Sequence, residues 1–430
     1  MLSALGLVVL WAIDAIVLRS VLLPVNPLEW PLMGMVLLGL FQLLPLRVHD
    51  AAGLPLSPTR SLSLDPYATR MVVVQVAALL IFFVATTLFV DTPRRLKTLV
   101  ITITIFGFVL AIFGLTQSFT SDGTRVYWFR QLSQSTAFGP FINRHHFAGF
   151  MELAAAIPFA LLLSGAIENY KRPLYAFAGV VMAMSLLATN SRGGIISLGA
   201  MMFFLLVTAS PGWGKQKRQS RQHRIRAAAL RGGLAVAVVV ILLGGALLLS
   251  GPEVFTRFLG TPIAEDPTTG RAHFWRVTMD VIKAYPLVGS GLGSFGAIYT
   301  RYDTRNGMFR LEQAHNDYLQ TLSDAGIVGA ILGIAFIFIL VRRGFARRET
   351  HDRFRRAVTT GALAGCFAAL VHSFFDFTLH TTANALLFLV LAAIATQDTR
   401  INTTYQPDRK RRRRSSRREE STALISDNSA

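Results

Sequence analysis

The chain has 430 residues, of which 52% are apolar and 16% are charged, with a mean hydropathy of +0.46 and a net charge of +19. A soluble protein of this length is expected to show shorter apolar runs and the alternation typical of strands. Instead, apolar runs of about 15 to 22 residues recur along the chain, close to the roughly 20 residues that a helix needs to cross a bilayer. The composition predicts an all-α, polytopic integral membrane protein.

Eleven segments match a membrane-spanning helix in length and composition. In chain order they are Leu2–Leu23, Trp30–Leu46, Met71–Val90, Leu99–Thr116, Phe147–Ile167, Leu174–Thr189, Gly193–Thr208, Leu234–Leu249, Ile327–Val341, Ala357–Phe375 and Thr382–Thr396. The predicted parts are an N-terminal transmembrane bundle (1–250), a periplasmic segment with amphipathic helices (251–326), C-terminal transmembrane helices (327–396) and a basic, disordered tail (397–430).

The positive charge is concentrated in five segments between or after the spans. They are residues 91–98, 168–172, 211–231, 342–356 and 397–430. The positive-inside rule places all five in the cytoplasm, so the long segment 250–326 is predicted outside. An odd number of spans then leaves the N-terminus outside, unless a further helix precedes it. An Arg-rich tail can bind nucleic acid, but after a final span it is more often a topology signal that also attracts anionic lipid.

The external segment contains a predicted amphipathic helix with apolar residues at helical spacing between 274 and 282, typical of a helix on the membrane surface. Arg271 and Trp275 lie one turn apart on it, and Arg276 follows. An arginine fork suits a diphosphate or a carboxylate because it binds two oxygens at once. An interfacial arginine that only snorkels to water is an equally good interpretation of Arg271.

A glycine-rich stretch, GLGSFG at Gly291–Gly296, follows this helix and matches GxGxxG. A dinucleotide site needs a strand before that motif and a helix after it, inside a βαβ unit. A helix and Pro286 precede it here, so the glycines are predicted to form a tight turn.

His315 lies where a helix is predicted to run directly into the span at Ile327, and Tyr318 falls one turn further on the same face. A neutral imidazole held at the outer interface can take a proton from a hydroxyl near pH 7. The alternative is an interfacial histidine that bonds a backbone carbonyl.

Two further groups of polar residues lie on the same side of the predicted bundle. Arg192, in TNSRGG, lies at the outer end of a span, backed by two glycines that let other groups approach. A charge at a helix end that only snorkels to water is an equally good interpretation. Arg144, His145 and His146 begin another span, and adjacent histidines on a helix point about 100° apart, which makes them poor ligands for one metal.

His372 and Asp376 are spaced i, i+4 near the outer end of their span. They are either a catalytic orienting pair or part of a structural hydrogen bond between helices. With the groups above, they place the polar chemistry at the outer leaflet, which fits a substrate tethered to lipid.

The stretches RAHFW, PLVGSGLGSF and AHNDYLQTLSDAGIVGAIL together resemble the signature region of the O-antigen ligase / O-antigen polymerase superfamily. NRHHFAGF and SRGG resemble its upstream motifs, and LSLDPYATR resembles a stretch of exopolysaccharide-linked members. The resemblance covers the chain from about Ser61 to about Thr396. It implies a multi-pass protein of the bacterial inner membrane that moves a glycan from polyprenyl diphosphate to an acceptor hydroxyl on the periplasmic face. In ligases the acceptor is the lipid A core, and in polymerases it is another lipid-linked repeat unit.

The resemblance also implies roles for individual residues. Arg192 and Arg271 would hold the leaving diphosphate, and His315 would remove the acceptor proton, so that the anomeric carbon is inverted. Further candidates for substrate binding are Arg144, His146, Trp275, Arg276, Asn316 and Tyr318. Neither a metal nor a cofactor is expected, and the expected partners are the lipid-linked donor, the acceptor and membrane lipid, with no nucleic acid. Ligases of this kind have twelve spans, one more than predicted here.

Two other functions are compatible with a polytopic chain. A secondary transporter is expected to carry broken helices and charged groups near the bilayer midplane, often in two related halves. A scaffold of a polysaccharide assembly complex would not need Arg192, Arg271 or His315.

Overall fold

The computed structural model describes residues 2–18, 25–46, 61–121, 123–132, 136–208, 271–304, 311–350 and 352–397. The predicted span Leu234–Leu249, the basic loop 211–231 and the tail beyond residue 397 lie outside the described residues. The predicted division of the chain at residues 250, 326 and 396 stays a prediction.

Ten of the eleven predicted spans coincide with a helix, which confirms the all-α prediction. These helices are α1 (Leu2–Leu18), α2 (Glu29–Gln42), α3 (Pro66–Phe89), α4 (Pro93–Thr120), α5 (Arg144–Leu163), α6 (Arg172–Ala188), α7 (Arg192–Thr208), α13 (Asp317–Arg347), α14 (Arg353–His372) and α15 (Thr382–Thr396). Five of them, α3, α4, α5, α13 and α14, are long and apolar enough to cross a membrane, and α1, α7 and α15 are shorter apolar helices.

The remaining described elements are short. They are α11 (Arg271–Ala284), α12 (Phe295–Tyr302), the 3₁₀ turns η1 (Asn169–Lys171) and η2 (Thr378–His380), and a hairpin of β1 (Arg125–Val126) and β2 (Arg130–Gln131). The amphipathic helix predicted after residue 270 is α11.

Side-chain caps decide where several helices begin. The residues whose side chains accept a hydrogen bond from the first turn of a helix are Asp65, Thr92, Asn143, Asn316 and Asp352. A cap satisfies amide groups that the helix itself leaves unpaired. In α3 and α4 a proline directly follows the cap, where its missing N–H costs nothing.

Helices α5 and α14 form the centre of the bundle. Of an apolar 18-residue stretch in each, 78% and 67% is buried, against 33% in α3, α4 and α13. Small residues allow the close approach: a Cβ on Gly361 would lie 2.8 Å from the Ala160 side chain, and one on Gly365 would lie 3.2 Å from Ala156. Without a hydrophobic driving force in lipid, such close van der Waals packing drives helix association.

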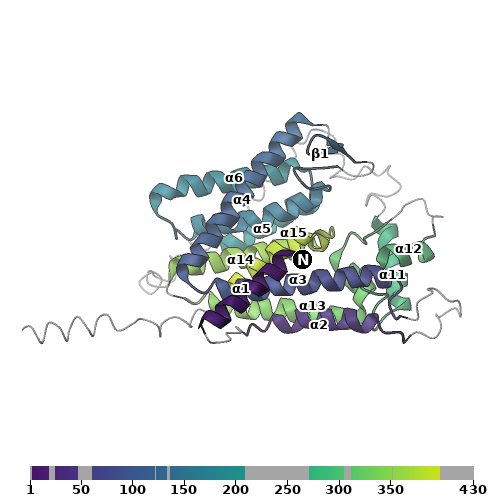
Figure 1. The fold of residues 1–430 in the computed structure, drawn as a ribbon. Coiled ribbons are helices and arrows are strands. Elements are labelled where there is room, and N and C mark those ends of the chain that lie inside the picture. The colour runs from purple at the N-terminus through teal and green to yellow at the C-terminus, as the bar shows by residue number, and fades with distance from the viewer. Residues whose placement is uncertain are drawn as a thin grey trace, which may run out of the picture.

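The long helices run alongside one another between two ends of the bundle (Figure 1). One end, here called the α11 end, carries α11 and α12 and the starts of α5, α7, α13 and α15. The other, here called the basic end, carries residues 342–356. There Arg348 Nη2 donates to the Thr208 carbonyl at 2.5 Å, and Arg355 Nη2 donates to the Gln397 carbonyl at 3.1 Å. The ends of α7 and α15 therefore meet the loop between α13 and α14.

Helix α13 is kinked at Gly326, where φ is +62° and ψ is −162°. The amides of the two residues after the kink donate to the carbonyls of Pro286 and Leu287, at 2.8 and 3.1 Å. In return the amides of Ser290 and Gly291 donate to the carbonyls three and two positions before the kink, at 2.8 and 3.1 Å. The loop after α11 thus supplies the hydrogen bonds that α13 loses at its kink.

The predicted tight turn at the GxGxxG stretch is present, and three glycines of this loop have positive φ. Its amides are already used within the chain: Leu292 donates to Gln42 Oε1 at 2.9 Å, and Gly293 donates to Asp324 Oδ2 at 3.0 Å. The preceding element is the helix α11, not a strand. The loop is therefore a clasp between helices and not a phosphate cradle.

Candidate functional site

The candidate site is centred on Asp376, which is 1% exposed in the turn after α14. His315 Nδ1 lies 3.1 Å from its Oδ1, and Arg271 Nη2 lies 3.4 Å from its Oδ2. His145 Nδ1 lies 3.9 Å from the same Oδ2. Groups from α5, α11, the start of α13 and the end of α14 therefore meet on one carboxylate, here called the Asp376 cluster.

The environment keeps Asp376 anionic. Burial alone would raise the pKa of its carboxyl, but the hydrogen bond with His315 and the charge of Arg271 hold that pKa well below its usual value. A carboxylate that accepts the Nδ1 proton of His315 fixes the tautomer and leaves the Nε2 lone pair available as a base.

Several contacts hold His315 at this position. Its φ of +53° is left-handed, an uncommon conformation for a residue with a Cβ. Trp275 Nε1 donates to the carbonyl of the preceding Ala314 at 3.1 Å. The Phe377 ring meets the imidazole edge-on with centroids 4.9 Å apart, and the Phe274 ring stacks at 6.2 Å. Trp275, predicted to bind substrate, therefore contacts the loop that carries His315.

Asn316, also predicted to bind substrate, has a structural role instead. Its Oδ1 accepts from the amides of Tyr318 and Leu319, each at 3.0 Å, and its Nδ2 donates to the Phe374 carbonyl at 3.1 Å. The side chain caps α13 and ties it to the turn that carries Asp376. Both ends of the amide are engaged within the chain, and a role of Asn316 in substrate binding stays a prediction.

Arg192 is half-buried at the first position of α7. Ser191 just before it bonds His145 Nδ1 at 2.8 Å, which links this helix start to the Asp376 cluster. The glycines after Arg192 were predicted to let other groups approach. What approaches is α14: a Cβ on Gly193 would lie 2.8 Å from the His372 ring and 2.9 Å from Phe375 Cβ.

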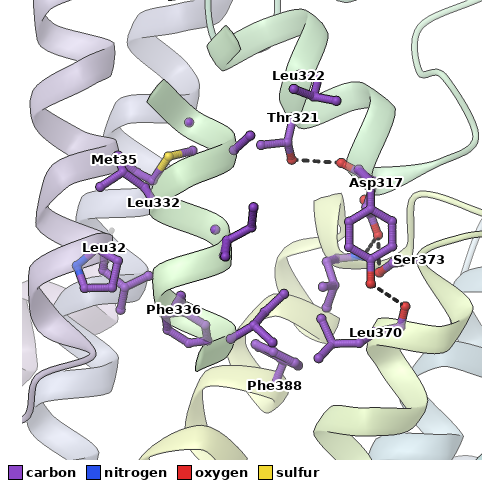
Figure 2. A pocket seen from close by; sticks show the side chains of 18 residues that line it. Leu32, Met35, Asp317, Thr321, Leu322, Leu332, Phe336, Leu370, Ser373 and Phe388 are labelled. Carbon is purple, nitrogen blue, oxygen red and sulfur yellow. Dashed lines mark hydrogen bonds between the residues drawn. The ribbon is translucent and has the colours of Figure 1, made fainter. Parts of the chain in front are cut away.

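An apolar groove of about 420 Å³ opens beside the cluster, between α2, α13, α14 and α15 (Figure 2). Leu32 and Met35 line it from α2, and Leu370 faces them from α14. Its polar lining comes mainly from the start of α13 and the end of α14, where Tyr318 OH donates to the Leu370 carbonyl at 2.7 Å. Tyr318 therefore faces the groove, not the Asp376 cluster.

A family model described as O-antigen ligase matches residues 177–334, a stretch that begins in α6 and ends in α13. It contains Arg192, Arg271 and His315. Residues 177–334 belong to the O-antigen ligase family. No curated protein matches the chain. The chain is a multi-pass membrane protein of polysaccharide biosynthesis.

Asp376 and His145 lie outside residues 177–334 in sequence but share the Asp376 cluster with Arg271 and His315. The sequence indicates His145 only as an unsuitable metal ligand and Asp376 only as a partner for His372. His372 instead bonds Glu152 through Nδ1 at 3.0 Å, both side chains being fully buried. Of the two interpretations of the i, i+4 pair, the structural hydrogen bond between helices applies to His372, whereas Asp376 contacts His315.

The other predicted substrate-binding residues differ in how they are placed around the Asp376 cluster. His146 packs edge-on against Phe377 at 4.7 Å, and its buried Nε2 has no hydrogen-bond partner among the described residues. Arg144 is half-buried at the start of α5. Arg276 is exposed on α11, and no hydrogen bond or ion pair described for it reaches Asp376.

A further histidine–carboxylate pair, His380 with Asp317, stabilises the turn that carries Asp376. His380 Nδ1 lies 2.6 Å from Asp317 Oδ1, and Ser373 Oγ donates to Asp317 Oδ2 at 2.8 Å. The start of α13 thus holds both sides of the turn, through His315 with Asp376 and through Asp317 with His380.

Proposed function

We propose that the protein transfers a glycan from a polyprenyl diphosphate carrier to an acceptor hydroxyl, as an O-antigen ligase does. The observation that carries the proposal is the meeting of Arg271 and His315 on Asp376, inside and beside the ligase domain. A base fixed by a carboxylate and a cation in one cluster are the two groups that displacement of a diphosphate requires.

The reaction is an in-line displacement. His315 Nε2 takes the proton of the acceptor hydroxyl while its oxygen forms a bond to the anomeric carbon. The bond from that carbon to the diphosphate oxygen breaks on the opposite face, so the configuration inverts. Arg271 and Arg192 stabilise the charge that develops on the departing diphosphate, without a metal ion. The Asp376 carboxylate stabilises the imidazolium that forms.

The groove supports a lipid-linked donor. It is apolar along most of its length and polar where α13 begins, at Asp317 and Tyr318. A polyprenyl chain lying there would place its diphosphate near the Asp376 cluster. Because the chain would enter from lipid, van der Waals packing against the groove and not transfer from water would hold it there.

The charge distribution supports a periplasmic site. The basic end carries residues 342–356 together with Arg94, Arg95 and Lys97 at the start of α4. By the positive-inside rule, this end and the tail would face the cytoplasm. The Asp376 cluster would then lie at the periplasmic face of the inner membrane.

The test is the length of glycan left on the polyprenyl diphosphate carrier in a strain that lacks the protein. Long polymer on the carrier is expected for a ligase, and single repeat units would identify a polymerase of the same superfamily. An unchanged carrier pool would contradict glycosyl transfer and favour a secondary transporter.

The same strain separates the residues of the site. We expect Arg271→Ala and His315→Ala to fail to restore the wild-type pool. Lys283→Ala, which removes an exposed basic side chain at the far end of α11, should restore it. Restoration by His315→Ala would refute the mechanism.

A further inference from the structure

We propose that His145 is a positioning residue that holds Arg192 at the Asp376 cluster. The inference rests on the proposed function, in which Arg192 stabilises the leaving diphosphate. It starts from a chain of contacts between three helices that are distant in sequence: α5, α7 and α14.

The first link is between α5 and α7. His145 Nδ1 lies 2.8 Å from Ser191 Oγ and 3.9 Å from Asp376 Oδ2, so one ring nitrogen faces both groups. Ser191 is fully buried, and its Oγ also accepts from the Gly194 amide at 3.2 Å, which caps the first turn of α7. The hydroxyl that starts α7 is therefore in contact with the histidine beside Asp376.

A second polar layer lies deeper in the same helices. Glu152, two turns after His145 on α5, bonds His372 of α14 at 3.0 Å and accepts from Ser197 of α7. Ser197 Oγ is also 2.9 Å from the Gly194 carbonyl. All of these side chains are fully buried, where hydrogen bonds are costly to lose.

The two layers leave the first turn of α7 little freedom to move. The Gly194 amide donates to Ser191, which contacts His145. The Gly194 carbonyl accepts from Ser197, which also donates to Glu152. Gly193 lies so close to His372 that a single Cβ would come within 2.9 Å of the ring nitrogen. Arg192 lies between Ser191 and Gly193, so its backbone position is set by His145 above and by the buried layer below.

The contacts of His145 indicate positioning and not proton transfer. Its Nδ1 is engaged by Ser191, while the hydrogen bond to Asp376 Oδ1 that orients a base belongs to His315. A change at His145 should therefore act through Arg192, on donor binding and on departure of the diphosphate.

The test compares two amides at this position in the full-length protein. The branch of an asparagine amide occupies the place of the imidazole Nδ1, whereas glutamine places its amide one bond further, near Nε2. We expect His145→Asn to stay close to wild type. His145→Gln and His145→Ala should lower kcat/KM for the lipid-linked donor on the order of 10²-fold, the usual cost of a misplaced group.

Two readouts distinguish positioning from other roles. The pH profile of His145→Asn should match that of the wild type, because no titrating group of the reaction has been removed. Adding His145→Ala to an Arg192→Lys variant should cost less than in the wild type, since both changes act on one interaction. Equal losses for Asn, Gln and Ala, or full additivity with Arg192→Lys, would overturn the inference.

His315→Ala is assayed in parallel. If it is active, the proposed function itself fails. If it is inactive while His145→Ala is fully active, only the role of His145 fails. Thermal unfolding of each variant shows that the chain is still folded.

Discussion

Asp376 lies at the centre of the proposed site and contacts its candidate groups through both carboxylate oxygens. Its two oxygens separate the roles of the cluster, since Oδ1 faces the His315 imidazole and Oδ2 faces Arg271. A neutral amide of the same shape would keep one hydrogen bond and lose the charge that selects the tautomer and stabilises the imidazolium.

We therefore expect Asp376→Asn to lower the rate of glycan transfer by about 10²- to 10⁴-fold, the range of a general base contribution. Asp352→Asn is the matched control, because Asp352 caps α14 at the basic end and asparagine caps a helix equally well. Both rates can be measured with purified lipid-linked donor. A rate for Asp376→Asn within a few-fold of that of the control would contradict the role of the carboxylate.

The depressed pKa of Asp376 also predicts a pH dependence of stability. A carboxyl whose pKa is lower in the folded state stabilises it above the unfolded-state pKa of about 3.9, and this stabilisation is lost as the pH falls through the folded value. The difference in melting temperature between the wild type and Asp376→Asn should stay constant from neutral pH to about pH 5 and shrink only in stronger acid. A difference that disappears near pH 6 would show that the carboxyl is not held anionic.

At the scale of elements, the kink of α13 predicts opposite effects for two glycines of one helix. A Cβ on Gly326 would lie 2.4 Å from the Leu287 carbonyl oxygen, and the residue has positive φ, whereas a Cβ on Gly333 meets nothing within 4 Å. Gly326→Ala should lower the melting temperature strongly and release the clasp. Gly333→Ala should raise it slightly, since alanine is favoured over glycine in a helix by about 1 kcal/mol. Changes of the same sign would refute the clasp.

The sequence predicted elements better than their junctions. Apolar runs of helical length identified ten helices because span length and hydropathy depend only on local composition. The kink at Gly326 is encoded by residues 286–291, about 35 to 40 positions away, so no local periodicity reveals it. Likewise residue types and motifs single out His315, Arg271 and Arg192, but the carboxylate that His315 and Arg271 share depends on how α14 ends beside α13. The pairing of His372 with Glu152 depends on helix packing in the same way.

For the whole molecule, the two ends predict which residues water-soluble reagents reach from outside the cell membrane. The single cysteine, Cys366, is buried, so it gives little background in labelling. Tyr67, 71% exposed at the α11 end, and Tyr170, 72% exposed at the basic end, form a matched pair. A membrane-impermeant maleimide should label Tyr67→Cys in intact spheroplasts and label Tyr170→Cys only after permeabilisation. The reverse pattern would invert the proposed topology.

The clasp between the loop after α11 and the kink of α13 has a consequence for building chimeras. If acceptor choice resides in the segment between α11 and α13, exchanging that segment alone between related proteins would strip α13 of the partners for its exposed amides and carbonyls. The transplantable unit is instead the stretch from residue 271 to about residue 330, moved together with the residue at position 42, whose side chain bonds the Val288 and Asp324 carbonyls. Recombination points inside that stretch are expected to give chains that fail to insert, and points outside it to give exchangeable specificities.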